Sequence, residues 1–246
     1  MTIGAKPMTE DLYSRILEKA LGRFRFVDFM RPGKGEGRAI WRHDVDLSPL
    51  RAASMARLEV RFGVRADYFF LLSSDFYNAL EPACTDLIRE VAGLGHRVGL
   101  HFAPPRGDAR AALRAQRDAL SLLVGSPVHS FSLHNPTTLD ASAWQDDLIE
   151  GMVNASAPSW RSSFTYCSDS NGTWRFQSLE EVVNDPSIVN LHALTHPEWW
   201  PPVAMRPREI VERIVRERAS ATLKGYDLLL KTHGRPNLGA SERSSA

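Results

Sequence analysis

The chain has 246 residues, and its 43% of hydrophobic and 24% of charged residues are the proportions of an ordinary globular protein with a sizeable core. Thirty lysines and arginines against 29 aspartates and glutamates leave a net charge of +1, so no strong overall field favours nucleic acid or an anionic membrane. No stretch approaches the roughly 20 apolar residues that span a bilayer, and the length suits a single domain.

The chain begins with alternating helix and strand patterns. The first residues show no basic stretch followed by an apolar core, so we expect no secretory signal and a cytoplasmic protein. Residues 1–37 are predicted to form an N-terminal helix and lead-in, with Thr9 as the helix cap and Gly22 at its end. A strand from Arg38 to Asp44 and a helix over residues 48–62 follow.

The same alternation continues to the end of the chain. Apolar runs predict strands over residues 67–72, 96–102, 127–134, 162–166, 173–176 and 188–194, and helical spacing of apolar residues predicts helices over 87–94, 112–123 and 206–231. Alternating strand and helix units predict a parallel sheet, and their number lets the sheet close into an α/β barrel over residues 38–235. Residues 236–246 are expected to form a disordered tail.

A dense polar cluster follows the first predicted strand of the barrel. Asp44 and Asp46 lie two residues apart, so on a strand their side chains project from the same face. Two carboxylates held together either share a proton or neutralise a cation. An isolated pair of this kind is more often a helix cap with a salt bridge, here to Arg42.

Two histidines at the ends of later predicted strands favour a metal site over a structural role for the two aspartates. His101 ends the strand over 96–102, and His134 ends the strand over 127–134. Because the carboxyl ends of parallel strands meet at one edge, we expect both imidazoles to lie near the two aspartates. A carboxylate and two imidazoles leave positions open for water and substrate, as a catalytic metal requires. Cys84 and Cys167 lack metal-ligand spacing and are expected to be reduced.

Two later segments add groups for acid catalysis. Asp169 stands in a turn, and His196 follows the strand over 188–194. An aspartate beside an imidazole holds its tautomer and raises its pKa, so His196 can protonate a leaving amine. The alternative is an ordinary turn residue for Asp169. Trp199 and Trp200 can either pack in the core or present flat faces to a sugar, and the sequence leaves both readings open.

Five ordered segments together resemble the polysaccharide deacetylase superfamily, the NodB-homology or carbohydrate esterase family 4 type. They are Arg42-His-Asp-Val-Asp46, Gly95-His-Arg-Val-Gly-Leu-His101, His134-Asn-Pro136, Ser168-Asp-Ser-Asn-Gly-Thr-Trp174 and Thr195-His-Pro-Glu-Trp199. The first is typical of a branch of the family with an RHDVD motif. The resemblance covers residues 38–200 and implies an irregular (β/α)7 barrel in a single domain.

The resemblance also implies roles for the residues. The first motif supplies a catalytic base, Asp44, and a metal ligand, Asp46. The second supplies the metal ligand His101, but Pro105 stands where the family usually has a further histidine. In the RHDVD branch the later histidine segment implies His134 as the third ligand, with His43, His192 and His196 as the other candidates.

The last two motifs imply Asp169 as the orienting residue and His196 as the catalytic acid. His192 is the competing candidate for that acid and lies within the predicted strand. Five residues near these motifs are expected to bind substrate: Arg42, Asn135, Trp174, Arg175 and Trp199.

The implied activity is removal of an N-acetyl group from an amino sugar by a metal-dependent hydrolase. Zinc is the default ion, although cobalt, nickel, manganese and iron suit the same ligands. The substrate is expected to be a nucleotide-linked, lipid-linked or oligosaccharide precursor, for example in O-antigen synthesis, with no nucleic-acid partner and no stable membrane insertion. Hydrolysis of a formamide or ring amide, and a catalytically silent carbohydrate-binding barrel, are the alternatives. An iron oxygenase is disfavoured because His43 and Asp46 are spaced one residue too far apart.

Overall fold

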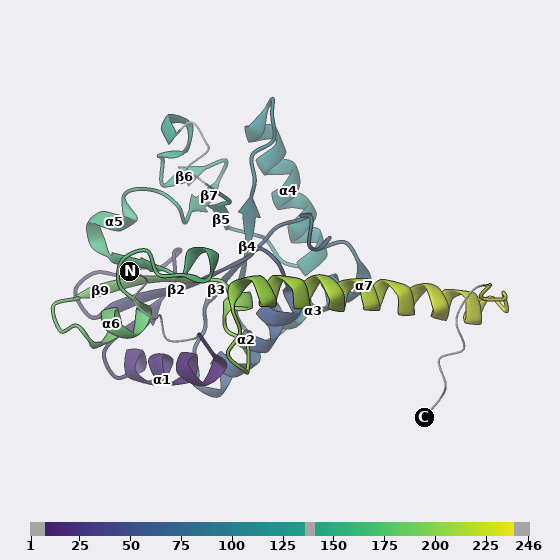
Figure 1. The fold of residues 1–246 in the computed structure, drawn as a ribbon. Helices are drawn as coiled ribbons and strands as arrows, with labels where there is room; N and C mark the ends of the chain where they lie inside the picture. The colour runs from purple at the N-terminus through teal and green to yellow at the C-terminus, as the bar shows by residue number, and fades with distance from the viewer. Residues whose placement is uncertain (1–7, 136–140, 239–246) are drawn as a thin grey trace.

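Nine strands form one sheet in the computed structural model, which describes residues 8–135 and 141–238 (Figure 1). The strands are β1 (Arg25–Val27), β2 (Arg38–Val45), β3 (Asp67–Phe70), β4 (Arg97–Phe102), β5 (Ser130–Leu133), β6 (Leu148–Ile149), β7 (Met152–Asn154), β8 (Thr165–Ser168) and β9 (Asn190–Thr195). Their order in the sheet is β6-β7-β5-β4-β3-β2-β9-β8, with β1 beside the start of β2.

The strands from β7 to β8 all run parallel, which confirms the α/β class predicted from the sequence. Strand β6 pairs antiparallel with β7 as a short hairpin at one end of the sheet. Within the described ranges, no pairing joins the end strands β6 and β8. The sheet therefore curls as in an irregular α/β barrel but stays open on one side.

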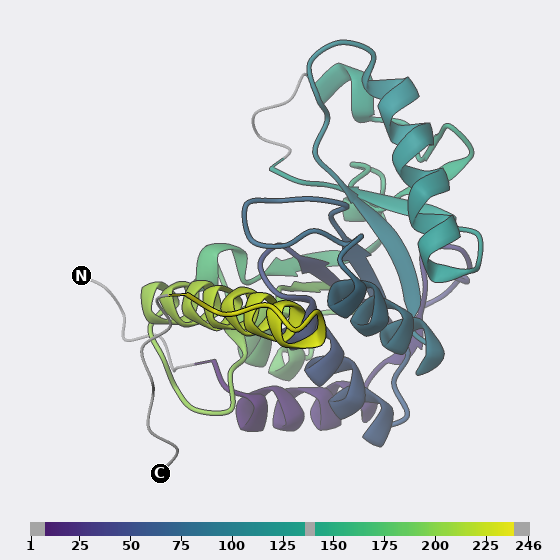
Figure 2. The ribbon, with the colours of Figure 1, turned by 90° about the vertical axis from the view of Figure 1, so that its right-hand side faces the viewer.

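Helices cover the outside of the sheet. They are α1 (Glu10–Leu21), α2 (Pro49–Arg61), α3 (Pro82–Gly93), α4 (Ala109–Val124), α5 (Trp160–Ser163), α6 (Leu179–Asn184) and α7 (Pro207–Thr232), with 3-10 turns η2 (Ala141–Trp144), η3 (Ser170–Gly172) and η4 (Pro197–Trp199). Figures 1 and 2 show α1, α2 and α3 side by side under the sheet, while the second half of α7 extends away from it. Among the helices in the described ranges, none is long and apolar enough to cross a bilayer.

Local sequence explains where the predicted helices begin and end. The Thr9 hydroxyl accepts a hydrogen bond from the Leu12 amide at 3.2 Å and caps α1, as the sequence predicts. The Ser48 hydroxyl caps α2 in the same way. Gly125 ends α4 with φ of 78°, a left-handed conformation that glycine adopts without steric cost.

Two predicted strands differ in the structure. The strand expected over 162–166 lies three residues later, as β8, because α5 occupies the residues before it. No strand forms over 173–176: Asn171 and Gly172 have φ of 57° and 69°, which curls the chain into η3. Of the tail expected to be disordered, residues 239–246 lie outside the part that the structure describes.

A small second core fills the interior of the curled sheet. It consists of Phe29, Ile40, Phe69, Ala155 and Phe164. Gly99 on β4 faces the Phe69 ring so closely that a side chain there would collide with it. The candidate site lies at the carboxyl ends of the strands, where Asp46 follows β2 and His134 follows β5.

Candidate functional site

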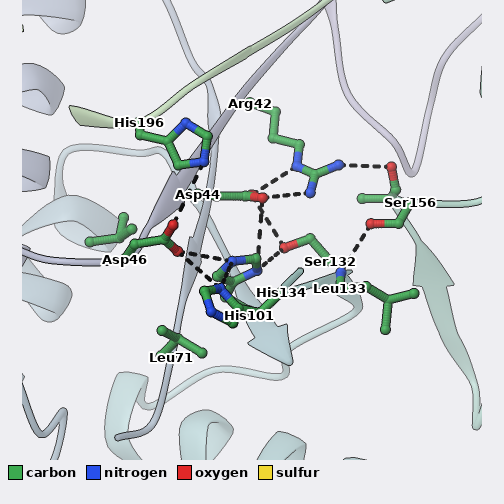
Figure 3. A network of polar contacts seen from close by, with 12 residues as sticks. Arg42, Asp44, Asp46, Leu71, His101, Ser132, Leu133, His134, Ser156 and His196 are labelled. Atoms are coloured by element: carbon green, nitrogen blue, oxygen red, sulfur yellow. Dashed lines mark hydrogen bonds and ion pairs between the residues drawn. The ribbon is translucent and has the colours of Figure 1, made fainter. Parts of the chain in front are cut away.

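Three predicted metal ligands meet at the carboxyl edge of the sheet (Figure 3). Asp46 follows β2, His101 lies in β4, and His134 follows β5. The His101 Nε2 atom lies 3.1 Å from Asp46 Oδ1, and the His134 Nδ1 atom lies 3.4 Å from the same oxygen. The two imidazole nitrogens are 3.2 Å apart. Residues from three separate strands thus present three donor atoms to one point.

This triangle fits a bound divalent ion. Bonds of about 2.05 Å in a tetrahedral site place neighbouring donor atoms about 3.3 Å apart, close to the three distances observed. The Asp46 Oδ1 atom is buried and faces the two imidazole nitrogens without making a hydrogen bond in the described structure, so an ion between the three donor atoms would satisfy it. Burial raises the pKa of Asp46, but His101 and His134 outweigh it and hold that pKa below its usual range, so the carboxylate is ionised.

Asp44 lies beside this cluster and is fixed by Arg42. The Arg42 Nε and Nη2 atoms donate to Asp44 Oδ1 at 2.8 Å and to Oδ2 at 2.7 Å, and both side chains are buried. Burial raises the pKa of Asp44, but the Arg42 charge with His101 lowers it to about 2. Arg42, expected to bind substrate, donates to Asp44 and to the Ala155 carbonyl oxygen.

Ser132 links the ligand candidate His101 to Asp44, and the sequence analysis did not identify it. Its hydroxyl lies 2.7 Å from His101 Nδ1 and donates to Asp44 Oδ1 at 3.2 Å (Figure 3). His101 and Ser132 are register partners on β4 and β5, which explains the contact. The alternation of Ser130, Ser132 and His134 was the available signal, because these residues share one face of the predicted strand.

His196 approaches the cluster from β9 and is held by Asp169. The His196 Nδ1 atom lies 2.7 Å from Asp169 Oδ1, and its Nε2 atom lies 3.8 Å from Asp46 Oδ2. Asp169 is fully buried and also accepts from the His196 amide and from the Trp200 indole at 2.8 Å. Burial lowers the pKa of His196, but the hydrogen bond and charge of Asp169 raise it to about 10. The imidazole is therefore a cation that can give up a proton.

The competing histidines lie elsewhere. His192 is buried in β9 between the rings of Phe29 and Tyr166, and burial lowers its pKa to about 3. His43 faces the outer side of the sheet and lies 2.8 Å from Glu59. Neither belongs to the ligand cluster found within the described ranges.

The other residues expected to bind substrate are spread around the site. The Asn135 amide lies 2.8 Å from His134 Nε2. Arg175 is exposed and faces the Phe176 ring. Trp174 and Trp199 line a cavity of about 450 Å³, and none of the three ligand candidates lines that cavity. Trp199 is only 8% exposed, so it packs more than it presents a face to solvent.

Comparison with known proteins finds distant structural likenesses. No family model and no curated protein matches the chain. A peptidoglycan N-acetylglucosamine deacetylase shares 15% identity over 87% of this chain and 90% of its own, with a TM-score of 0.47. A chitin deacetylase from the fungal pathogen Colletotrichum lindemuthianum shares 16% over 73% and 81%, with a TM-score of 0.48. A family 4 carbohydrate esterase from Bacillus anthracis shares 15% over 90% and 89%, with a TM-score of 0.41.

These names belong to the class of enzyme that the five sequence segments resemble. At identities of 15–16% and TM-scores below 0.5, however, these likenesses do not determine the function of this chain, which depends on the chemistry of its own site residues.

Proposed function

We propose that the chain is a metal-dependent hydrolase that removes an N-acetyl group from an amino sugar. The observation that carries the proposal is the convergence of three kinds of group at one edge of the sheet. Asp46, His101 and His134 form a ligand set, Asp44 is an ionised carboxylate beside it, and His196 is a buried cation on the other side of Asp46. Metal-dependent amide hydrolysis uses a combination of ion, base and acid of this kind.

One divalent ion, zinc by default, would be held by the three ligands, and it supplies Lewis-acid polarisation of a carbonyl and a more acidic water. The chain's own residues then handle the protons. Asp44 Oδ1 already accepts from Arg42 and Ser132, whereas Oδ2 accepts from Arg42 alone. Since a carboxylate oxygen has two lone pairs, Oδ2 is the atom left to take a proton from the attacking water.

His196 supplies the proton that the departing nitrogen needs. Its Nδ1 is occupied by Asp169, so Nε2, the atom that faces Asp46, is the donor. The Asp169 carboxylate is fixed by three donors from the His196 and Trp200 region, which prevents the imidazole from rotating away. The amine then leaves as a neutral molecule and acetate remains.

The test replaces Asp44 with asparagine, which keeps the side-chain shape but removes the base. We expect bound metal, measured by elemental analysis, to stay near the parent value. We expect kcat on N-acetylated amino sugars to fall by about 10²–10⁴. Asp67→Asn is the control, because Asp67 is also buried and paired with an arginine, Arg97 at 2.7 Å, but lies outside the ligand cluster. An Asp44→Asn enzyme that turns over like its parent would contradict the role of Asp44.

Product analysis separates the deacetylase from the alternatives. N-acetylated nucleotide sugars, lipid-linked saccharides and oligosaccharides form the assay panel, and acetate is the expected product. Formate from an N-formyl analogue, without acetate from any member, would favour a deformylase on the same ligands. Bound metal without any hydrolysis would favour a silent carbohydrate-binding barrel.

A further inference from the structure

We infer that Ser132 is a positioning residue that sets the tautomer of His101 and thereby prepares it to bind the metal. The inference rests on the proposed function and extends it to a residue outside the family motifs quoted above. Ser132 is fully buried and lies between His101 and Asp44, two residues with different roles in the site.

The direction of each hydrogen bond follows from the number of available protons. Arg42 donates to both oxygens of Asp44, which keeps that carboxylate ionised and therefore only an acceptor. The one proton of the Ser132 hydroxyl must then point to Asp44 Oδ1, at 3.2 Å. The Ser132 oxygen is left to accept, and its partner at 2.7 Å is His101 Nδ1.

His101 Nδ1 consequently carries a hydrogen, and its Nε2 carries a lone pair. Nε2 is the atom that faces Asp46 and His134, at 3.1 and 3.2 Å. A histidine binds a metal through an unprotonated nitrogen, and the partner of its other nitrogen fixes which one that is. The series of hydrogen bonds from Arg42 through Asp44 and Ser132 to His101 thus orients the His101 imidazole. It acts on Nδ1, the ring nitrogen that does not face the metal site.

No direct contact replaces this bridge. Asp44 Oδ2 lies 3.8 Å from His101 Nδ1, beyond hydrogen-bonding distance. Removing the Ser132 hydroxyl would leave the His101 N–H without an acceptor in a site where both side chains are 2–4% exposed. The imidazole could then adopt the opposite tautomer or rotate, and either change weakens the ligand.

The strand offers a matched control. Ser130 lies two residues before Ser132 on the same face of β5, is also buried, and stands opposite Gly99. Ser130→Ala removes the same hydroxyl from the same strand without touching the chain of hydrogen bonds.

The experiment measures zinc affinity by competition with a chromogenic chelator, on the full chain, and then kcat and KM for an N-acetylated amino sugar. We expect Ser132→Ala to weaken zinc binding about 10-fold or more, the usual effect of losing a hydrogen-bond partner of a ligating histidine. Its kcat at saturating zinc should fall while KM changes little. Ser130→Ala should match the parent in every measurement, and Ser132→Thr, which keeps a hydroxyl, should recover part of the zinc affinity.

The outcomes separate this inference from the proposed function. Zinc affinity of Ser132→Ala within twofold of the parent would overturn the positioning role and leave the metal site intact. Equal losses in both alanine variants would also overturn it, because packing would then explain the effect. A parent chain that binds no zinc would overturn the proposed function and this inference together.

Discussion

Two buried glutamates have opposite surroundings. Glu59 on α2 and Glu198 in η4 are both 0% exposed. Glu59 accepts hydrogen bonds from the Tyr13 hydroxyl, from the Tyr68 hydroxyl at 2.7 Å and from His43 at 2.8 Å. Neither carboxyl oxygen of Glu198 has a hydrogen-bond partner in the described structure.

The partners decide the charge of each group. Burial raises the pKa of both carboxyls. At Glu59 the charge and hydrogen bond of His43 outweigh burial and lower the pKa, so this glutamate is a buried anion. At Glu198 burial and the nearby Asp46 charge raise the pKa to about 8, so the side chain is neutral at pH 7.

The different hydrogen bonding of the two glutamates distinguishes groups that stabilise the fold from groups that are available to a ligand. The Glu59 network lies on the helix-covered side and leaves no acceptor unused: it ties α1, α2, β2 and β3 together, and through His43 it reaches Thr195 on β9 at 2.8 Å. Of the six buried side-chain atoms without a hydrogen-bond partner in the described residues, four belong to Asp46, Glu198 and Trp199, and the others to Arg38 and His192. Saturated polar groups stabilise a fold, whereas unsaturated ones are available to a ligand.

Breaking the saturated network should have the largest effect. Glu59→Gln keeps the shape but puts an amide N–H₂ against donors and removes the charge that holds them. We expect the free energy of unfolding to fall by about 3 kcal/mol, measured by urea denaturation. Glu90→Gln is the control, since Glu90 is a partly exposed glutamate paired with Arg57 and should change stability by less than about 1 kcal/mol. Equal effects of the two substitutions would contradict the comparison.

The two tyrosines that donate to Glu59 should differ in how much they contribute to stability. The Tyr13 hydroxyl also accepts from the Trp41 indole at 2.6 Å, whereas no such second partner appears for Tyr68 in the described contacts. Tyr13→Phe therefore leaves a buried N–H unpaired and should cost about 2 kcal/mol, against about 1 kcal/mol for Tyr68→Phe. Denaturation of both variants in one series measures the difference. A larger loss for Tyr68→Phe would mean that the Trp41 bond contributes nothing.

The effect expected at the unsaturated glutamate, Glu198, depends on pH. The folded-state pKa of Glu198, about 8, lies above the 4.5 of an unperturbed glutamate. Its contribution to stability is thus fully present below the unfolded pKa and is lost as pH rises toward 8. Glu198→Gln should be more stable than the parent at pH 8 and equally stable at pH 4. Unfolding of chelator-treated protein at both values measures this, and a variant less stable than its parent at pH 8 would be inconsistent with a neutral Glu198.

The sequence predicted the fold class and most of the site because both depend on local patterns. Apolar runs marked the parallel strands, and polar residues at their ends marked Asp46, His101 and His134, whose meeting follows from parallel topology alone. Glu59 could not be found in this way. A glutamate within a helix has the pattern of a solvated position, and only the tertiary contacts with helix α1 and strands β2 and β3 show that Glu59 is buried.

The strand wrongly predicted over 173–176 has a related cause. Its β-prone residues follow Asn171 and Gly172, and the left-handed backbone of that pair decides the local conformation. Trp200 was left open between packing and sugar binding, because no local pattern shows that its indole N–H reaches Asp169, 31 residues earlier in the chain.

Helix α7 spans the edge of the cooperative folding unit. Its first turns are anchored by buried Ile210 and Ile214, and Arg218 donates to Glu81 at the start of α3 at 2.8 and 3.1 Å. Beyond Arg218 the helix extends into solvent with leucines and a tyrosine more than half exposed (Figure 1). About 14 residues without tertiary support form only a marginal helix. We therefore expect two melting events along one continuous helix: its first turns should unfold with the barrel, and the rest should unwind and re-form while the barrel stays folded.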